Sequence, residues 1–231
     1  MKNRIVEAAI IAVGIICLGL CIRNGIKIFS QKDRAVEVKG LAEMEVPANK
    51  VICPILYKDL GNDLAQLYVD MNKKNQAIIS FIKENGIQEN EISPSAPEIV
   101  DMAAERFIEN KSPYRYNLTS VITISTPNVD KVLALMSRQA ELLKQGIAVT
   151  VNNYSIRYEY TKLNEIKPQM IEEATKNARK AAEKFAKDSG SKLGKIKSAT
   201  QGQFIISDRD ENTPYIKNVR VVSTITYYLE D

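Results

Sequence analysis

The stretch EATKNARKAAEKFAKDSGSKLGKIK, residues 173–197, contains a charged helix, a glycine that ends it and the start of a strand. Apolar residues at three-to-four spacing predict a helix over residues 168–190. The apolar positions of this helix are Ile171, Ala174, Ala178, Ala181, Ala182 and Phe185. Most of them are alanine, and small side chains let a helix approach a sheet closely. We therefore expect this helix to lie against a β-sheet.

Strands are predicted on both sides of this helix along the chain. Residues 192–206 and 218–229 form a final pair around an acidic loop, residues 208–212. Residues 115–126 alternate as the clearest strand of the chain, and residues 147–160 form another, whose change of parity at Asn152-Asn153 predicts a bulge.

The first part of the domain adds a predicted β-hairpin from residues 36–46 and 50–57, broken at Pro47. A helix is predicted from an N-cap at Asn62 to Gly86. A second begins at Thr126-Pro127 and stops at Gly146.

The order β-β-α-β-β-α-β-α-β-β is typical of an α+β fold in which three main helices cover antiparallel sheet. We assign residues 36–231 to this domain and residues 31–35 to a short polar linker. Residues 103–113 are predicted to form a polar excursion from the sheet.

The chain begins with an apolar segment, IVEAAIIAVGIICLGLCI, that runs from Ile5 to Ile22 and carries one charge, Glu7. A helix of that length reaches ~27 Å, close to the hydrocarbon thickness of a bilayer. A cleaved secretory signal needs a cleavage site with two small residues separated by one other residue, and this segment offers only poor matches to that pattern. We therefore expect an uncleaved signal anchor within residues 1–30, with a cleaved signal and a buried helix as the alternatives.

The position of this segment predicts where the domain works. A single N-terminal anchor followed by one large polar domain places that domain in the periplasm or another extracytoplasmic space, on a single-pass protein of a bacterial inner membrane. Basic residues on both sides of the segment leave its orientation open under the positive-inside rule.

Composition excludes several kinds of function. The net charge is +4, but residues 1–30 carry +3 of it, so the rest of the chain is nearly neutral and lacks the basic face that nucleic acid requires. The chain contains no histidine, which removes Ser-His-Asp and Cys-His chemistry and the commonest transition-metal ligand. We therefore predict a protein that is not an enzyme, with no catalytic, cofactor-binding or metal-binding residue set and with an unknown small-molecule ligand, if it has one.

Two groups of residues allow a functional interpretation beside a structural one. Cys53 is the one cysteine outside the apolar segment, and it offers either a redox thiol or an inert buried side chain; the cation that activates a thiol is missing from its neighbours Ile52 and Pro54. Asp208, Asp210 and Glu211 offer either a calcium site or a polar hairpin tip, and they lack the glycine and terminal glutamate of a calcium-binding loop.

The lysines of the alanine-rich helix also allow two interpretations. Lys176, Lys180, Lys184 and Lys187 form a basic stripe that would suit a polyanion. Glutamates four residues away from several cations favour a solvated, ion-paired face instead.

The chain resembles the SIMPL domain family, also called DUF541. The match is strongest in residues 173–197, through Ala174, Ala178, Ala181, Ala182, Ala186, Gly190, Leu193 and Gly194. The stretch VKGLAEMEVPAN, residues 38–49, resembles the family's opening strand, with Ala42 in place of its second glycine. The family includes bacterial periplasmic oxidative-stress-defence proteins and a periplasmic immunogen.

The resemblance implies an exported or membrane-tethered α+β protein, and some members of the family assemble into large rings. No catalytic residue set comes with it. Two hypotheses follow. The first is a non-enzymatic, membrane-tethered envelope protein that self-assembles into a large homo-oligomer through its sheet edges and contributes to oxidative or envelope stress tolerance. The alternative is a redox or peroxide-scavenging protein that acts through Cys53.

Overall fold

The computed structural model describes residues 12–23, 25–26, 34–104, 113–151 and 155–230. They belong to two compact units. Unit 1 comprises Met1–Met44, Asn164–Ile206 and Val219–Asp231, and unit 2 comprises Glu45–Leu163 and Ser207–Asn218. Each unit combines antiparallel sheet with helix, so the predicted α+β class is confirmed.

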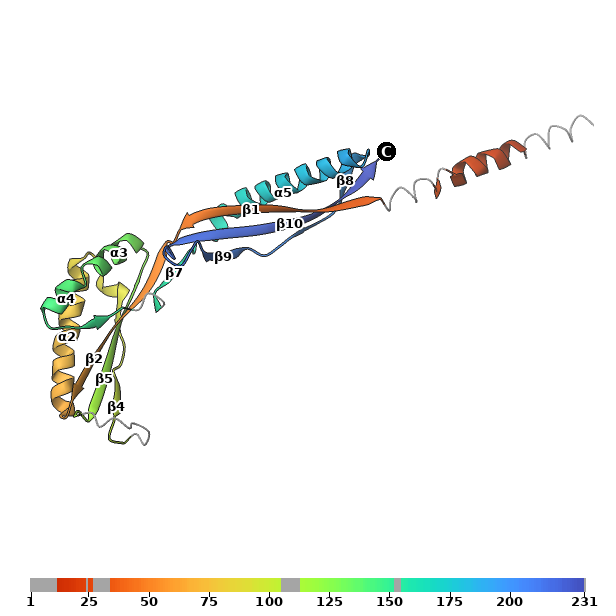
Figure 1. Ribbon diagram of the computed structural model, residues 1–231. Helices are drawn as coiled ribbons and strands as arrows, with labels where there is room; N and C mark the ends of the chain where they lie inside the picture. Colours follow the sequence, from red (N-terminus) through yellow and green to blue (C-terminus); the bar gives the residue numbers. More distant parts are fainter. Residues whose placement is uncertain (1–11, 24, 27–33, 105–112, 152–154, 231) are drawn as a thin grey trace, which may run out of the picture. The chain divides into compact units, whose positions relative to one another are not determined.

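The sheet of unit 1 has the strand order β1–β10–β8, with β9 also paired to β10. Helix α5 runs along one face of this sheet (Figure 1). The bounds are Ala35–Pro47 for β1, Lys192–Gln201 for β8, Ile205–Asp208 for β9, Ile216–Glu230 for β10 and Leu163–Asp188 for α5. The predicted final strand pair is therefore present, with β8 antiparallel to β10.

Alanine allows α5 to pack closely on the sheet, as the sequence predicts. The helix buries a stripe at four-residue spacing: Met170, Ala174, Ala178, Ala182 and Ala186. Of these, Ala178 and Ala182 pack in one cluster with the buried sheet residues Val38, Ile225 and Tyr227.

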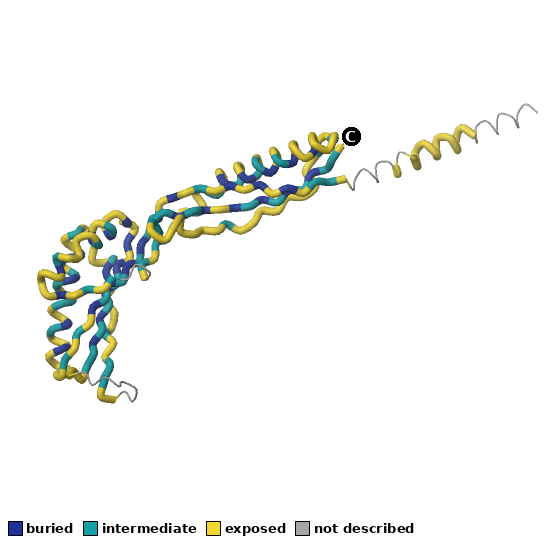
Figure 2. Tube along the Cα trace, viewed as in Figure 1, coloured by how far each residue is buried: buried dark blue, intermediate teal, exposed yellow. Residues whose placement is uncertain are grey.

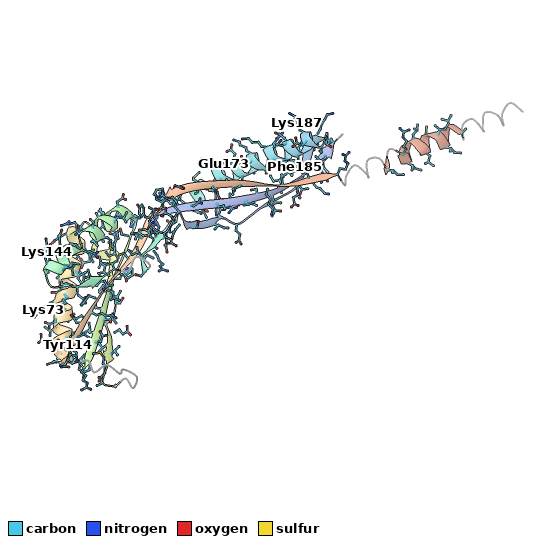
Figure 3. The ribbon with its side chains drawn as sticks, in the orientation of Figure 1. Lys73, Tyr114, Lys144, Glu173, Phe185 and Lys187 are labelled. Carbon is cyan, nitrogen blue, oxygen red and sulfur yellow. The ribbon has the colours of Figure 1, made fainter. Side chains whose placement is uncertain are left out.

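Two details of α5 differ from the prediction. The spacing predicts Phe185 in the apolar stripe, but Phe185 is 60% exposed (Figure 3). The buried stripe continues from Ala174 at four-residue intervals and therefore reaches Ala186 instead. The helix also begins at Leu163, and Pro168 lies inside it. Proline lacks a backbone N–H donor and is best tolerated in the first turn of a helix. Pro168 lies five residues after Leu163, so it does not mark the start of α5.

The sheet of unit 2 has the strand order β3–β5–β2–β6, with β4 also paired to β5 and β7 to β2. The strands are β2 Lys50–Gly61, β3 Ile92–Pro94, β4 Glu98–Asp101, β5 Tyr116–Thr126, β6 Val149–Thr150 and β7 Arg157–Glu159. The helices are α2 Leu64–Glu84, the 3-10 turn η1 Glu89–Glu91, α3 Val129–Ser137 and α4 Ala140–Lys144.

The core of unit 2 lies between α2, α3, α4 and one face of this sheet (Figure 2). Helix α2 buries Leu67, Met71, Ile78, Phe81 and Ile82. Alternate residues of β2 face them, and Val51, Cys53, Ile55 and Tyr57 are all at most 2% exposed.

The predicted hairpin of residues 36–46 and 50–57 is wrong. The two segments are strands, but β1 pairs with β10 and β2 pairs with β5, β6 and β7. The two residues that connect the strands, Ala48 and Asn49, do not close a hairpin turn, because their backbone amides donate to distant residues of the chain. Ala48 N–H donates to the carbonyl of Tyr215 at 2.8 Å, and Asn49 N–H donates to that of Glu159 at 2.9 Å.

The predicted C-terminal ends of the helices agree with the structure better than the predicted N-terminal ends. Gly86, Gly146 and Gly190 all have positive φ and follow a helix, as predicted. The N-cap of α2 is Asp63 and not Asn62, since the Asp63 carboxylate accepts from the amides of Ala65 and Gln66.

The other predicted segments also differ in part. The predicted helix from Thr126-Pro127 to Gly146 is two helices, α3 and α4, and Asn128 occupies the N-cap position of α3 without a side-chain hydrogen bond to the helix. The predicted strand over residues 147–160 is two short strands, β6 and β7. Residues 152–153, where a bulge was predicted, lie outside the described residues, as do residues 105–112 of the polar excursion.

The N-terminal segment is described in part. Residues 12–23 of the predicted anchor are helical and exposed, while residues 5–11 lie outside the described residues, as do residues 31–33 of the predicted linker. Within the described part of the chain, no helix combines the length and the apolar character that a bilayer crossing needs.

Candidate functional site

Cys53 lies in the core of unit 2 and not at a surface. Its residue is 0% exposed, and its Sγ lies 4.0 Å from Sδ of Met136. Burial raises the pKa of the Cys53 thiol to about 11. A thiol that is shielded from solvent and protonated at neutral pH is a poor nucleophile. The geometry therefore favours the inert, packed cysteine over the redox site.

The acidic loop forms a hairpin tip. The Asp210 carboxylate accepts hydrogen bonds from the amides of Asn212 at 2.9 Å and Thr213 at 2.8 Å, and from Nε of Arg209 at 3.0 Å. The Thr213 hydroxyl and the Arg209 guanidinium lower the pKa of Asp210 to about 2. Asp208 forms an ion pair with Lys217. The carboxylates hold the loop together, and no cluster of metal ligands occurs among the described residues.

The lysine stripe of α5 is an ion-paired, solvent-exposed face. Lys176 Nζ lies 2.5 Å from Oε1 of Glu172, and Arg179 Nε lies 2.9 Å from Oε1 of Glu183. Lys184 pairs with Asp188 at 3.3 Å. Acids thus pair with Lys176 and Lys184 of the stripe and with the neighbouring Arg179, which favours the solvated interpretation.

The two edges of the unit 1 sheet differ in how they are protected. At the β1 edge, α5 approaches so closely that the Asn177 side chain donates a 2.8 Å hydrogen bond to the backbone carbonyl of Leu41. The β8 edge has no such cover, because residues 195–201 are all exposed, with Ile196 at 52%. Among the described residues, no strand pairs with the outer side of β8. This free edge is a candidate interaction surface.

A second candidate is a groove on unit 2, on the face of the sheet opposite α2. It has a volume of about 570 Å³ and is lined by Pro54, Leu56, Lys58, Val121, Thr150 and Ser155. Side chains two residues apart on a strand share a face, so Pro54, Leu56 and Lys58 line the groove while Ile55 and Tyr57 lie under α2. We call this site the β2 groove.

Sequence reasoning missed the β2 groove, although a signal for it exists. The run VICPILY, residues 51–57, is apolar on both faces of its strand. Such runs are typical of strands that are covered on both sides. Here α2 covers one side, and Pro54, Leu56 and Val121 remain half-buried on the other.

Comparison with known proteins identifies the family. A search of curated proteins gives no significant match. The family model for SIMPL, described as a protein of unknown function (DUF541), matches residues 36–223. This range covers most of the chain and extends through both units, so the resemblance carried by the alanine-rich helix and the opening strand is confirmed. The chain therefore belongs to the SIMPL (DUF541) family.

Proposed function

We propose that this protein is a non-enzymatic assembly module of the bacterial envelope, tethered by its N-terminal segment, which self-associates through the free edge of β8. The observation that carries the proposal is the difference between the two edges of the unit 1 sheet. Natural proteins cover or charge a strand edge that must stay unpaired. At the β1 edge an α5 side chain bonds the backbone of Leu41, whereas no element among the described residues covers the outer side of the ten-residue β8, whose lysines all precede Ser198.

The composition of β8 suits pairing with another strand. Its last four residues, Ser198, Ala199, Thr200 and Gln201, carry no charge and no proline, whereas the first six include Lys192, Lys195 and Lys197, with the exposed apolar side chain of Ile196 between the last two. An added strand would gain backbone hydrogen bonds along this edge. The partner that we propose is a further copy of the same chain, leading to a large homo-oligomer.

Tethering would favour this assembly. The apolar run of residues 5–22 and its position at the N-terminus support a membrane-anchored protein with both units in the extracytoplasmic space. Anchoring in one plane raises the local concentration of the interacting edges, so weak contacts become effective. A contribution to oxidative or envelope stress tolerance is supported by the resemblance to exported SIMPL proteins.

Sedimentation of the full chain in detergent micelles, as a function of protein concentration, tests this proposal. We expect oligomers for the natural sequence and a shift toward monomer for Ile196→Lys, because a charge on an edge strand opposes pairing. The matched control is Val69→Lys, which places the same charge at a 46% exposed apolar residue of α2. A chain that stays monomeric at all concentrations, or that assembles equally well with Ile196→Lys, would contradict the proposal.

A further inference from the structure

We propose that one end of unit 1 rests on the lipid bilayer, with the Phe185 ring entering the headgroup region and Lys187 facing anionic phospholipids beside it. This inference rests on the membrane tether of the proposed function and adds a second contact with the same membrane. It depends on where the chain enters unit 1, on an exposed aromatic ring at that end and on the charges around the ring.

The chain enters unit 1 at the end of the sheet where helix α5 stops. The backbone carbonyl of Arg34, just before β1, accepts a 2.9 Å hydrogen bond from the amide of Leu229, near the end of β10. The Arg34 guanidinium lies 3.4 Å from Oγ of Ser191, and the Ser191 amide donates to the carbonyl of Ala186 at 2.8 Å. The start of β1, the end of β10 and the turn from α5 into β8 therefore meet in one place (Figure 1). We call the place that these four residues define the entry end.

The proposed tether keeps the entry end within reach of the bilayer. Residues 23–33 join the apolar segment, residues 5–22, to Arg34. A chain spans at most ~3.6 Å per residue, so this connection reaches on the order of 40 Å at full extension. Residues 216 and 229 of β10 lie roughly 40 Å apart along their strand, so the opposite end of the sheet is far from the point of attachment. The entry end is therefore the part of unit 1 that the tether holds nearest to lipid.

Phe185 presents an apolar ring to solvent at the entry end. It is 60% exposed and lies in the last turn of α5, three residues before Asp188. The buried stripe of the helix passes through Ala182 and Ala186, so the core does not use this ring. Apolar side chains of membrane-surface helices enter the boundary between headgroups and acyl chains to a depth of roughly 5–10 Å. Phe185 is within ~5 Å of the helix end and can reach that boundary.

Lys187 places a cation close to this ring. It is exposed and is the basic residue in the last turn of α5 (Figure 3). The ion pairs of the described part of α5 do not include it. A lysine near a surface of anionic lipid is attracted to it over a Debye length, about 8 Å at physiological ionic strength. Its ammonium group would stay among the phosphates while the ring of Phe185 leaves water.

The acidic residues of the entry end do not cancel this charge. Asp188 pairs with Lys184 at 3.3 Å. Glu230 lies directly across the strand pair from Lys192. Glu37 is out of phase with the buried residues of β1, so it belongs to the sheet face away from α5. The α5 side of the entry end therefore keeps an unbalanced cation next to its exposed ring.

A bilayer suits these features better than a second protein surface does. A specific protein interface buries roughly 800 Å² per partner, whereas one aromatic side chain supplies about 200 Å². A membrane contact needs less area here, because the tether already holds the two surfaces together and raises their effective concentration. Lipid also offers phosphate and hydrocarbon within a few ångströms of each other, which matches a cation next to an apolar ring.

The absence of tryptophan from the chain allows a direct test. We would place Phe185→Trp in the full chain, in liposomes of phosphatidylglycerol and phosphatidylcholine, and measure its quenching by phospholipids brominated on the acyl chain. We expect strong quenching and a blue-shifted emission. The matched control is Ile205→Trp, at an equally exposed residue of β9 away from the entry end (Figure 1), which should not be quenched. Equal quenching of the two variants, or none of Phe185→Trp, would overturn the inference.

Charge variants test the part played by the lipid headgroup. In the Phe185→Trp protein, Lys187→Glu should lower the quenched fraction roughly two- to threefold, because the reversed charge opposes approach to an anionic surface. The effect should disappear in liposomes of phosphatidylcholine alone. The matched control is Lys180→Glu, at an exposed lysine of the same helix that lies roughly 10 Å farther from the entry end, where screening weakens the attraction. Quenching that Lys187→Glu leaves unchanged would contradict the inference.

Two further results separate this inference from the proposals around it. Extraction of the liposomes with alkaline carbonate tests the tether: released protein would overturn both the tether and the lipid contact, whereas retained protein with unquenched Phe185→Trp would overturn the lipid contact alone. An emission that shifts to the blue as protein concentration rises, without quenching by bromine, would show that a second copy covers Phe185, and the inference would be wrong. Lys187→Glu should leave sedimentation unchanged, because self-association is assigned to the β8 edge.

Discussion

Gly40 of β1 lies directly beneath the backbone carbonyl of Ala174 in α5, so that a methyl group at residue 40 would overlap that oxygen. The same methyl group would lie 2.8 Å from Cβ of Ala178. Glycine on the strand and alanine on the helix together set how closely the two backbones approach in unit 1.

Replacing this glycine should therefore destabilise unit 1. We expect Gly40→Ala to lower the free energy of unfolding by about 3 kcal/mol, because overpacking forces the backbones apart. Urea denaturation followed by circular dichroism measures the change. Gly194→Ala is the comparison, since its added methyl would lie 2.8 Å from the flexible carboxylate of Glu230 and 3.0 Å from the backbone carbonyl of Tyr228, a milder contact than at Gly40; a loss as large as that of Gly40→Ala would contradict the explanation.

The Tyr57 hydroxyl should stabilise unit 2 through a buried hydrogen bond. It lies 2.9 Å from Oδ1 of Asn75 and 3.1 Å from the carbonyl of Met71, and Ser120 also donates to Oδ1 of Asn75. Tyr57→Phe keeps the ring and removes the hydroxyl, so we expect a loss of about 1 kcal/mol. Chemical denaturation measures it, and Tyr68→Phe, at a 53% exposed residue of α2, should have no effect.

The Cys53 thiol should be unreactive in the folded protein. In a chain with Cys17→Ser and Cys21→Ser, we expect Ellman's reagent to modify Cys53 slowly in buffer and quickly in urea. Fast modification of the folded protein would show an accessible thiolate and would restore the redox hypothesis.

Cys53 should also make stability depend on alkaline pH. Its pKa rises from 9.0 to about 11 on folding, so the folded state retains a proton that the unfolded state loses. Stability is therefore unaffected below pH 9 and falls between pH 9 and 11, by on the order of 2 kcal/mol. Cys53→Val should lack this part of the decline. Identical pH profiles for the two proteins would contradict the prediction.

Asp210 should have the opposite effect at acid pH. Its hydrogen bonds lower its pKa from 3.8 to about 2, so the stability it adds is complete above pH 3.8 and is lost as the pH falls through 2. The difference in thermal midpoint between the natural protein and Asp210→Asn should shrink from pH 4 to pH 2. A constant difference would show that the charge on Asp210 does not stabilise the loop.

The sequence predicts the local elements of this fold well. Gly86, Gly146 and Gly190 mark helix ends because a residue with positive φ closes a helix and glycine adopts that conformation without strain. The alanine spacing of α5 predicts its buried stripe, because side chains four residues apart lie on one face of a helix. The two candidate surfaces, by contrast, were not predicted from residue patterns.

Strand pairing was decided by the tertiary structure. Residues 36–46 and 50–57 read as a hairpin because they are adjacent strands, yet β1 pairs with β10, whose partner residues lie far along the chain. Alternation shows which residues share a face, but not which strand supplies the hydrogen bonds.

By itself, the sequence determined the α+β class, the close-packing helix, the apolar N-terminal segment and the family, because each depends on short-range spacing or composition. The tertiary structure alone decided that the β8 edge is free, that Cys53 is buried and that Leu56 and Val121 meet in one groove. These three outcomes depend on which elements cover which faces, and residues distant in sequence fix that through packing.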